Sequence, residues 1–192
     1  MLHAPFPVIL DANVLLPLGL CDTLLGGAEA GLIQIYWTEH ILDEVQRNLV
    51  KELGLTERNA ARRVAAMRGA FPEAMLTGYE WLIPVMRNHP KDRHVLAAAV
   101  HIGAQTIVTS NLRDFKAEHL PKHMRARAPD VFLQNLLSQA PEVMLDVLHR
   151  QASRLKNPPI SFERLLDGLA RSVPGFIKEV RGLLPPPPFT QQ

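Results

Sequence analysis

The sequence has little cysteine, few aromatic residues and no long hydrophobic run. A lone cysteine, Cys21, cannot form an internal disulfide, so we expect a reducing compartment, the cytoplasm, and a small buried side chain at that position. The first residues, MLHAPFPVIL, lack the basic start of a signal peptide, and no apolar stretch has the length of a transmembrane helix. We therefore expect neither a disulfide-stapled secreted domain nor a membrane partner.

An excess of charge of either sign is also missing. Twenty-one Lys and Arg against 19 Asp and Glu leave a net charge of +2, which does not by itself indicate a nucleic-acid-binding protein. The basic residues form three short groups, each most simply a solvated face: Arg58, Arg62 and Arg63; Arg113 and Lys116; and Lys122, Arg125 and Arg127.

Strand and helix patterns alternate over the first two thirds of the chain. Apolar and β-branched stretches predict strands at 6–10, 33–37 and 106–110, with a weaker fourth near 127–129. Between them lie four helical patterns. The first ends at about Ala30, the second and third begin after the N-cap residues Thr38 and Thr56, and the fourth runs from Pro90 to Gly103. This alternation is typical of an α/β layered domain with a mainly parallel sheet.

The last third carries only helical patterns. Four apolar helical faces follow Asp130, the break Asn157-Pro158-Pro159 separates them, and the prolines at 185–188 should end regular structure. We expect residues 1–134 to form the α/β domain, and residues 135–192 a C-terminal helical extension with a disordered Pro-rich tail. The apolar faces of the extension should pack on the core or on a second subunit.

Acidic residues gather where the predicted strands end. Asp11 ends the first strand and Asp114 follows the third, while Asp92 lies in the first turn of the helix before that third strand. Glu44 lies in the helix after the second strand, on a stripe that is otherwise apolar. Since ligands of parallel sheets bind outside the carboxyl ends of the strands, we expect these four residues to meet there.

Four carboxylates at one edge repel one another, and a divalent cation removes that conflict. Mg²⁺ and Mn²⁺ prefer oxygen ligands and can activate a water against a phosphodiester. Arg93 or Arg113 could then hold the phosphate. Taken singly, Asp92 is explained as a helix N-terminal charge, Asp114 as a turn residue and Glu44 as a solvated position. Only a charge at the end of a buried strand, such as Asp11, seldom has a structural purpose.

Three segments carry a resemblance: VILDANVLL, ILDEVQRNL and HPKDRHVLAAAVHIGAQTIVTSNLRDF. In order and spacing they resemble the PIN-domain family, and within it the VapC-type toxins of bacterial toxin–antitoxin pairs. The resemblance implies a three-layer domain with a central mainly parallel sheet, metal-dependent endoribonuclease activity, homodimerisation, and inhibition by a cognate antitoxin protein. Ala12 departs from the pattern, since many relatives carry a hydroxyl residue there. The implied site has catalytic, metal-binding carboxylates and supporting hydrogen-bonding residues: Asp11, Glu44, Asp92 and Asp114; and Asn13, Thr109 and Asn111.

The sequence leaves other functions open. A haloacid-dehalogenase-like phosphatase would need Asp two residues after the nucleophile, and Asn13 stands there. A zinc site on His94 and His101 lacks Cys partners and the usual ligand spacing. A non-catalytic PIN-fold module that binds RNA or protein is the main alternative. The kind of RNA and the choice between Mg²⁺ and Mn²⁺ are not fixed by these residues.

Overall fold

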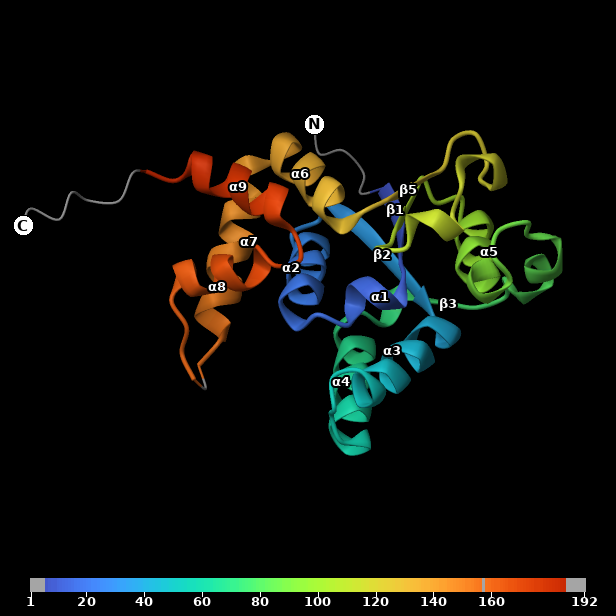
Figure 1. The fold of residues 1–192 in the computed structure, drawn as a ribbon, viewed down its shortest axis with the longest axis horizontal. Coiled ribbons are helices and arrows are strands. Elements are labelled where there is room, and N and C mark those ends of the chain that lie inside the picture. Colours follow the sequence, from blue (N-terminus) through green and yellow to red (C-terminus); the bar gives the residue numbers. More distant parts are fainter. Residues whose placement is uncertain (1–5, 157, 186–192) are drawn as a thin grey trace, which may run out of the picture.

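The computed structural model describes residues 6–156 and 158–185 (Figure 1). The expectations for Asn157 and for the proline-rich tail from residue 186 onward lie outside these residues. Within the described part of the chain, no helix has both the length and the apolar character needed to span a membrane.

A five-stranded sheet in the order β3-β2-β1-β4-β5 forms the centre, and all four pairings are parallel. The central strand β1 is buried, with Val8, Ile9 and Leu10 fully enclosed. The three predicted strands are confirmed, and the weak fourth lies two residues earlier than expected. The two-residue strand β3 was missed because so short a segment has no readable alternation. The strands are β1 Phe6–Leu10, β2 Ile33–Thr38, β3 Met75–Leu76, β4 Thr106–Val108 and β5 Arg125–Arg127.

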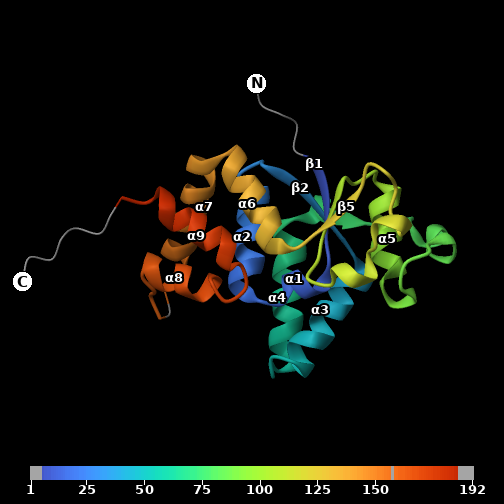
Figure 2. The ribbon, with the colours of Figure 1, turned by 45° about the horizontal axis from the view of Figure 1, so that its top comes forward.

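Helices cover both faces of the sheet. α5 packs against β1, β2 and β4 on one side, and α2 packs against β2 on the other (Figures 1 and 2). The side-chain hydroxyls of Thr38 and Thr56 cap α3 and α4 by accepting hydrogen bonds from backbone N–H groups, as predicted. These helices are α1 Ala12–Leu15, α2 Leu18–Glu29, α3 Glu39–Lys51, α4 Glu57–Ala70 and α5 Arg93–His101. Short 3₁₀ turns connect them, of which η2 Glu80–Val85, η3 Pro90–Asp92 and η4 Leu112–Asp114 matter below.

Four further helices follow (Figure 2): α6 Pro129–Gln139, α7 Pro141–Arg154, α8 Phe162–Leu169 and α9 Pro174–Leu183. α7 and α8 pack against α2, and α6 packs against α7 and α9. Their apolar faces join the same hydrophobic core as the sheet, as the sequence suggested. A Cβ atom on Gly26 of α2 would lie 2.6 Å from a methyl group of Val147 on α7, so a glycine is needed for this close approach. The expected division at residue 134 falls inside α6 and stays a prediction.

A carboxylate of α6 forms hydrogen bonds with the N-terminus of α9. Asp130 of α6 accepts hydrogen bonds from the backbone N–H groups of Gly175 and Phe176, at 3.1 and 2.8 Å. These N–H groups belong to the first turn of α9, which has no intrahelical acceptors for them. Asp130 therefore caps α9 from 45 residues away in sequence.

Candidate active site

Asp11 stands at the carboxyl end of β1, where the strand turns into α1. Only 4% of its surface is exposed. One carboxylate oxygen accepts a hydrogen bond from the backbone N–H of Ala12 at 2.7 Å, and the other accepts one from the Thr109 hydroxyl at 2.7 Å. Burial raises the pKa of Asp11 and the nearby charge of Glu44 adds to the rise, while the hydrogen bonds from Thr109 and Ala12 oppose it. Hydrogen bonds thus fix the position of the Asp11 carboxylate, while burial and the charge of Glu44 disfavour its negative charge.

Asn13 locks this arrangement to the neighbouring strand. Its side-chain amide donates to the second oxygen of Asp11 at 2.6 Å and to the Thr109 hydroxyl at 3.1 Å. Its side-chain oxygen accepts the backbone N–H of Ser110 at 2.8 Å. Residues predicted as supporting, Asn13 and Thr109, therefore connect the ends of β1 and β4 around Asp11.

Asp92 ends η3 and faces the same edge of the sheet. It is 5% exposed, and its Oδ2 atom has no hydrogen-bond partner among the described residues. Burial, together with the negative charges of Asp11 and Asp114, raises the pKa of Asp92 to about 6. A buried, unpartnered carboxylate oxygen is costly unless something compensates it.

Asp114 lies at the end of η4, on the solvent side of Asp92. The side-chain amide of Asn111 donates to its Oδ2 atom, and this hydrogen bond is the main reason why the pKa of Asp114 is lowered. Asn111 in turn accepts a hydrogen bond from Nε of Arg113 at 3.2 Å. The positive charge of Arg113 also contributes to the lowered pKa. Arg113, a predicted phosphate-binding residue, therefore lies at the rim of the acidic cluster.

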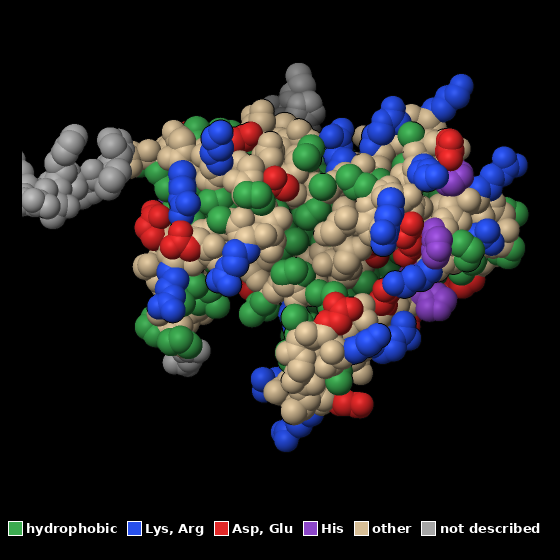
Figure 3. Space-filling view, in the orientation of Figure 1, with side chains coloured by type: hydrophobic (Ala, Val, Ile, Leu, Met, Phe, Trp, Pro, Cys, Tyr) green, Lys and Arg blue, Asp and Glu red, His purple; other side chains and the backbone are tan. Residues whose placement is uncertain are grey.

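Glu44 approaches the cluster from α3. Its side chain is 17% exposed, and its carboxylate lies 3.7 Å from the ammonium group of Lys91. Its charge acts on Asp11, as noted above, so the structure brings all four predicted carboxylates to one region. Figure 3 shows acidic side chains there, surrounded by Lys, Arg and His side chains, over the surface between α3 and α5.

Two residues of this region were not singled out from the sequence. Nδ1 of His89 lies 4.0 Å from Oδ2 of Asp92, and ligand atoms of His89, Asp92 and Asp114 lie within 4.8 Å of one another. Lys91 reaches Glu44 from the same turn. The one available signal was that both residues belong to the HPKD segment that leads into Asp92.

Arg93 is placed differently from Arg113. Its Nε atom donates to the backbone oxygen of Asn88 at 3.3 Å, and the residue is partly buried at the start of α5. It thus supports the loop before Asp92, and its role in phosphate binding stays a prediction.

The donor set fits a hard divalent cation. Carboxylate oxygens dominate, they repel one another, and one of them is buried without a partner, which is the situation that Mg²⁺ or Mn²⁺ resolves. Asp92 and Asp114, with His89 beside them, form the tightest group, and Asp11 and Glu44 extend it.

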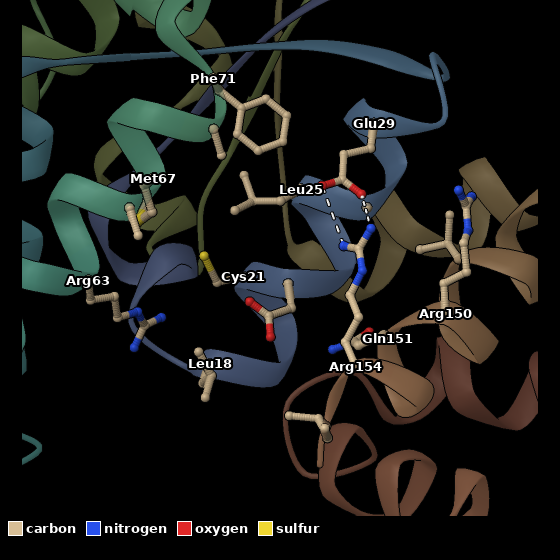
Figure 4. A pocket seen from close by; sticks show the side chains of 16 residues that line it. Leu18, Cys21, Leu25, Glu29, Arg63, Met67, Phe71, Arg150, Gln151 and Arg154 are labelled. Atoms are coloured by element: carbon tan, nitrogen blue, oxygen red, sulfur yellow. Dashed lines mark hydrogen bonds and ion pairs between the residues drawn. The ribbon is translucent and has the colours of Figure 1, made fainter. Parts of the chain in front are cut away.

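A hollow of about 330 Å³ between α2, α4 and α7 lies apart from these carboxylates (Figure 4). Its lining is largely apolar, and the ion pair between Arg154 and Glu29 crosses from α7 to α2. Cys21 lines it, but burial raises the pKa of this thiol to about 11, so it is not a nucleophile at neutral pH. The carboxylates at the sheet edge therefore remain the candidate site.

The parallel sheet, its carboxylate-bearing edge and a sequence match together identify the class: the chain belongs to the PIN-domain family, which matches residues 7–113. The VapC50 C-terminal domain matches residues 129–182. A Mycobacterium tuberculosis protein named putative ribonuclease VapC50 is 42% identical over 113 residues, which are 58% of this chain and 67% of the relative. No solved structure matches the chain. The predicted family and fold are thus confirmed, and the chain is a PIN-domain protein of the VapC type.

Proposed function

We propose that this protein is a Mg²⁺- or Mn²⁺-dependent endoribonuclease that hydrolyses RNA phosphodiester bonds, and that it is the toxin of a type II toxin–antitoxin system. The observation that carries the proposal is the meeting of Asp11, Glu44, Asp92 and Asp114 at the carboxyl edge of the sheet, with a buried Asp92 oxygen that lacks a hydrogen-bond partner among the described residues. RNA as the substrate is supported by the name of the Mycobacterium tuberculosis relative.

Each residue has a role in this proposal. Asp11 and Asp92 would hold the cation from the protein side, with Glu44 and Asp114 flanking them. Asn13 and Thr109 fix the Asp11 carboxylate through their hydrogen bonds, so it needs no rearrangement to serve as a ligand. Asn111 orients Asp114 in the same way. When bound, the cation supplies an activated water and neutralises charge on the phosphodiester.

Positively charged side chains around the carboxylates complete the proposed site. A phosphate that approaches four carboxylates is repelled, so positive charge at the rim is needed to bring RNA in. Arg113 lies beside Asp114 and Lys91 beside Glu44. Arg93 is the further candidate for a phosphate contact.

The partners follow from membership in the VapC type. We propose a cognate antitoxin protein that blocks the site, a homodimer as the assembled form, and the cytoplasm as the location. The α/β domain of residues 1–134 would carry the nuclease, and the extension of residues 135–192 would stabilise it.

The experiment is cleavage of total cellular RNA by the purified chain, free of antitoxin, with Mg²⁺ or Mn²⁺ and with EDTA. Wild type should cleave only with metal, and Asp11→Asn should not cleave. If folded wild type leaves RNA intact with both metals, the nuclease proposal fails and the non-catalytic PIN-fold module takes its place.

A further inference from the structure

A hollow of about 480 Å³ adjoins the carboxylate cluster on the side of Glu44. One wall is a face of α3, and the other is formed by Ile83 of η2 and by the turn that leads into α5. Five α3 residues line it. Asn48 lies beside a stripe formed by the other four, which are spaced four, three and four apart along the helix: His40, Glu44, Arg47 and Lys51. This stripe extends roughly 16 Å along the helix axis, and thus leads away from the acidic cluster.

The hollow carries positive charge. Lys91 is engaged by Glu44 at 3.7 Å. Arg47 and Lys51 are exposed, and within residues 6–156 and 158–185 neither forms an ion pair. Two uncompensated cations beside an acidic site are suited to an anion that must approach that site.

The same hollow contains a pair of aromatic rings. The imidazoles of His40 and His94 pack edge to face, with ring centres 5.0 Å apart. Nδ1 of His94 lies 3.0 Å from the backbone oxygen of Lys91, and Nδ1 of His40 lies 3.5 Å from the Tyr79 hydroxyl. These contacts orient both rings. Flat rings next to cations are the combination that single-stranded RNA-binding sites use for bases and phosphates.

We propose that this hollow binds the nucleotide adjacent to the cleaved phosphodiester of a single-stranded RNA. Arg47 and Lys51 bind its backbone phosphate, and the ring of His40 stacks on its base. The inference rests on the proposed function, because it takes RNA to be the substrate. A peptide occupant is disfavoured because the lining offers few apolar side chains, chiefly Ile83 and Pro90, to serve as anchors.

The test measures binding of a fluorescein-labelled, unstructured oligoribonucleotide to the full chain by anisotropy, over a series of salt concentrations. Asp11→Asn serves as the background, so that RNA is bound without being cleaved. The double variant Arg47→Ala/Lys51→Ala is compared with Arg58→Ala/Arg62→Ala. Both pairs are exposed, lie four residues apart on a helix and remove two positive charges, but only the first lines the hollow. Thermal unfolding of each variant checks that the fold is retained.

We expect Arg47→Ala/Lys51→Ala to raise Kd about tenfold and to reduce the slope of log Kd against log salt by about 0.7, the value for one phosphate of a single strand that is no longer neutralised. The control pair should change neither. His40→Ala should weaken binding several-fold, and His40→Phe should restore it, because a phenyl ring keeps the stacking surface.

The outcomes separate this inference from the nuclease proposal. Wild type that binds RNA through Arg47 and Lys51 but never cleaves it would refute the nuclease and support the binding site. Wild type that cleaves RNA, with equal Kd and salt slope for both double variants, would refute the binding site alone. If Arg47→Ala/Lys51→Ala instead leaves RNA binding unchanged but no longer retains a co-expressed antitoxin, the hollow is a contact surface for a protein. The inference would then be overturned.

Discussion

Asp92→Asn should stabilise the metal-free protein, although it alters a residue proposed to be essential for activity. In the native fold, the Asp92 carboxylate is buried beside Asp11 and Asp114, and its Oδ2 atom lacks a hydrogen-bond partner within the described residues, with Nδ1 of His89 at 4.0 Å. Asparagine has nearly the same shape, removes one negative charge, and adds an amide that can donate to Asp114. The perturbation therefore relieves repulsion without opening a cavity.

The magnitude follows from the raised pKa. A change from 3.8 in the unfolded chain to about 6 in the folded one corresponds to about 3 kcal/mol at a pH well above 6. Because the folded pKa is the higher one, the folded state holds the proton more tightly, and the carboxylate destabilises the fold as pH rises from about 4 to 6. Below that window the destabilisation is absent, and above it the full effect remains. With allowance for local relaxation, we expect Asp92→Asn to add about 2 kcal/mol at pH 7.5, a rise in Tm of about 4–8 °C.

The assay is thermal unfolding in EDTA from pH 4 to pH 8, with Asp43→Asn as the control. Asp43 is an exposed acid on α3, so its neutralisation should shift Tm little. The difference between Asp92→Asn and wild type should be near zero at pH 4 and should reach its plateau above pH 6. On addition of Mn²⁺, wild type should gain stability and Asp92→Asn should gain less. An Asp92→Asn protein no more stable than wild type at pH 7.5 in EDTA would refute the electrostatic argument.

Three further outcomes are expected. The affinity for Mn²⁺, measured by calorimetry, should fall about tenfold from pH 7 to pH 5. Asp92 has a pKa of about 6 and must lose its proton to bind the metal. An affinity that does not change with pH would exclude Asp92 as a ligand. Asn13→Ala should reduce the cleavage rate about 10- to 100-fold, since it removes the amide that orients Asp11, and should lower Tm by at least about 2–4 °C, since its hydrogen bonds join the ends of β1 and β4. Unchanged rates would argue against the orienting role. Asp130→Ala should lower Tm by about 2–8 °C without loss of specific activity, because the cap of α9 contributes about 1–2 kcal/mol, and an unchanged Tm would show the cap to be dispensable.

Local patterns were sufficient to predict most of the sheet and the helix starts. β1 is a short apolar run, and Thr38 and Thr56 are strong N-cap residues, so each element could be read from its own segment. The meeting of Asp11 with Thr109, 98 residues apart, was predictable because parallel strands present their carboxyl ends at the same edge. The roles of these residues in catalysis stay predictions.

Other features depend on tertiary structure that no local pattern reports. The approach of His89 to Asp92 results from the path of the turn before α5, and the His40–His94 pair requires α3 and α5 to converge. The hydrogen bonds from Gly175 and Phe176 to Asp130 likewise depend on how α6 and α9 pack. Such contacts become visible only once the packing of the elements is known.

The central claim, that the carboxylates at the sheet edge cut RNA with a divalent cation, is tested most directly by two neighbouring residues of α3. Glu44 is half-buried and its charge acts on Asp11, whereas Asp43 is exposed to solvent. In single-turnover cleavage of a labelled RNA with Mn²⁺, Glu44→Gln should lose activity on the order of a hundredfold or more, and Asp43→Asn should match wild type. Equal activity of Glu44→Gln and Asp43→Asn would contradict the account.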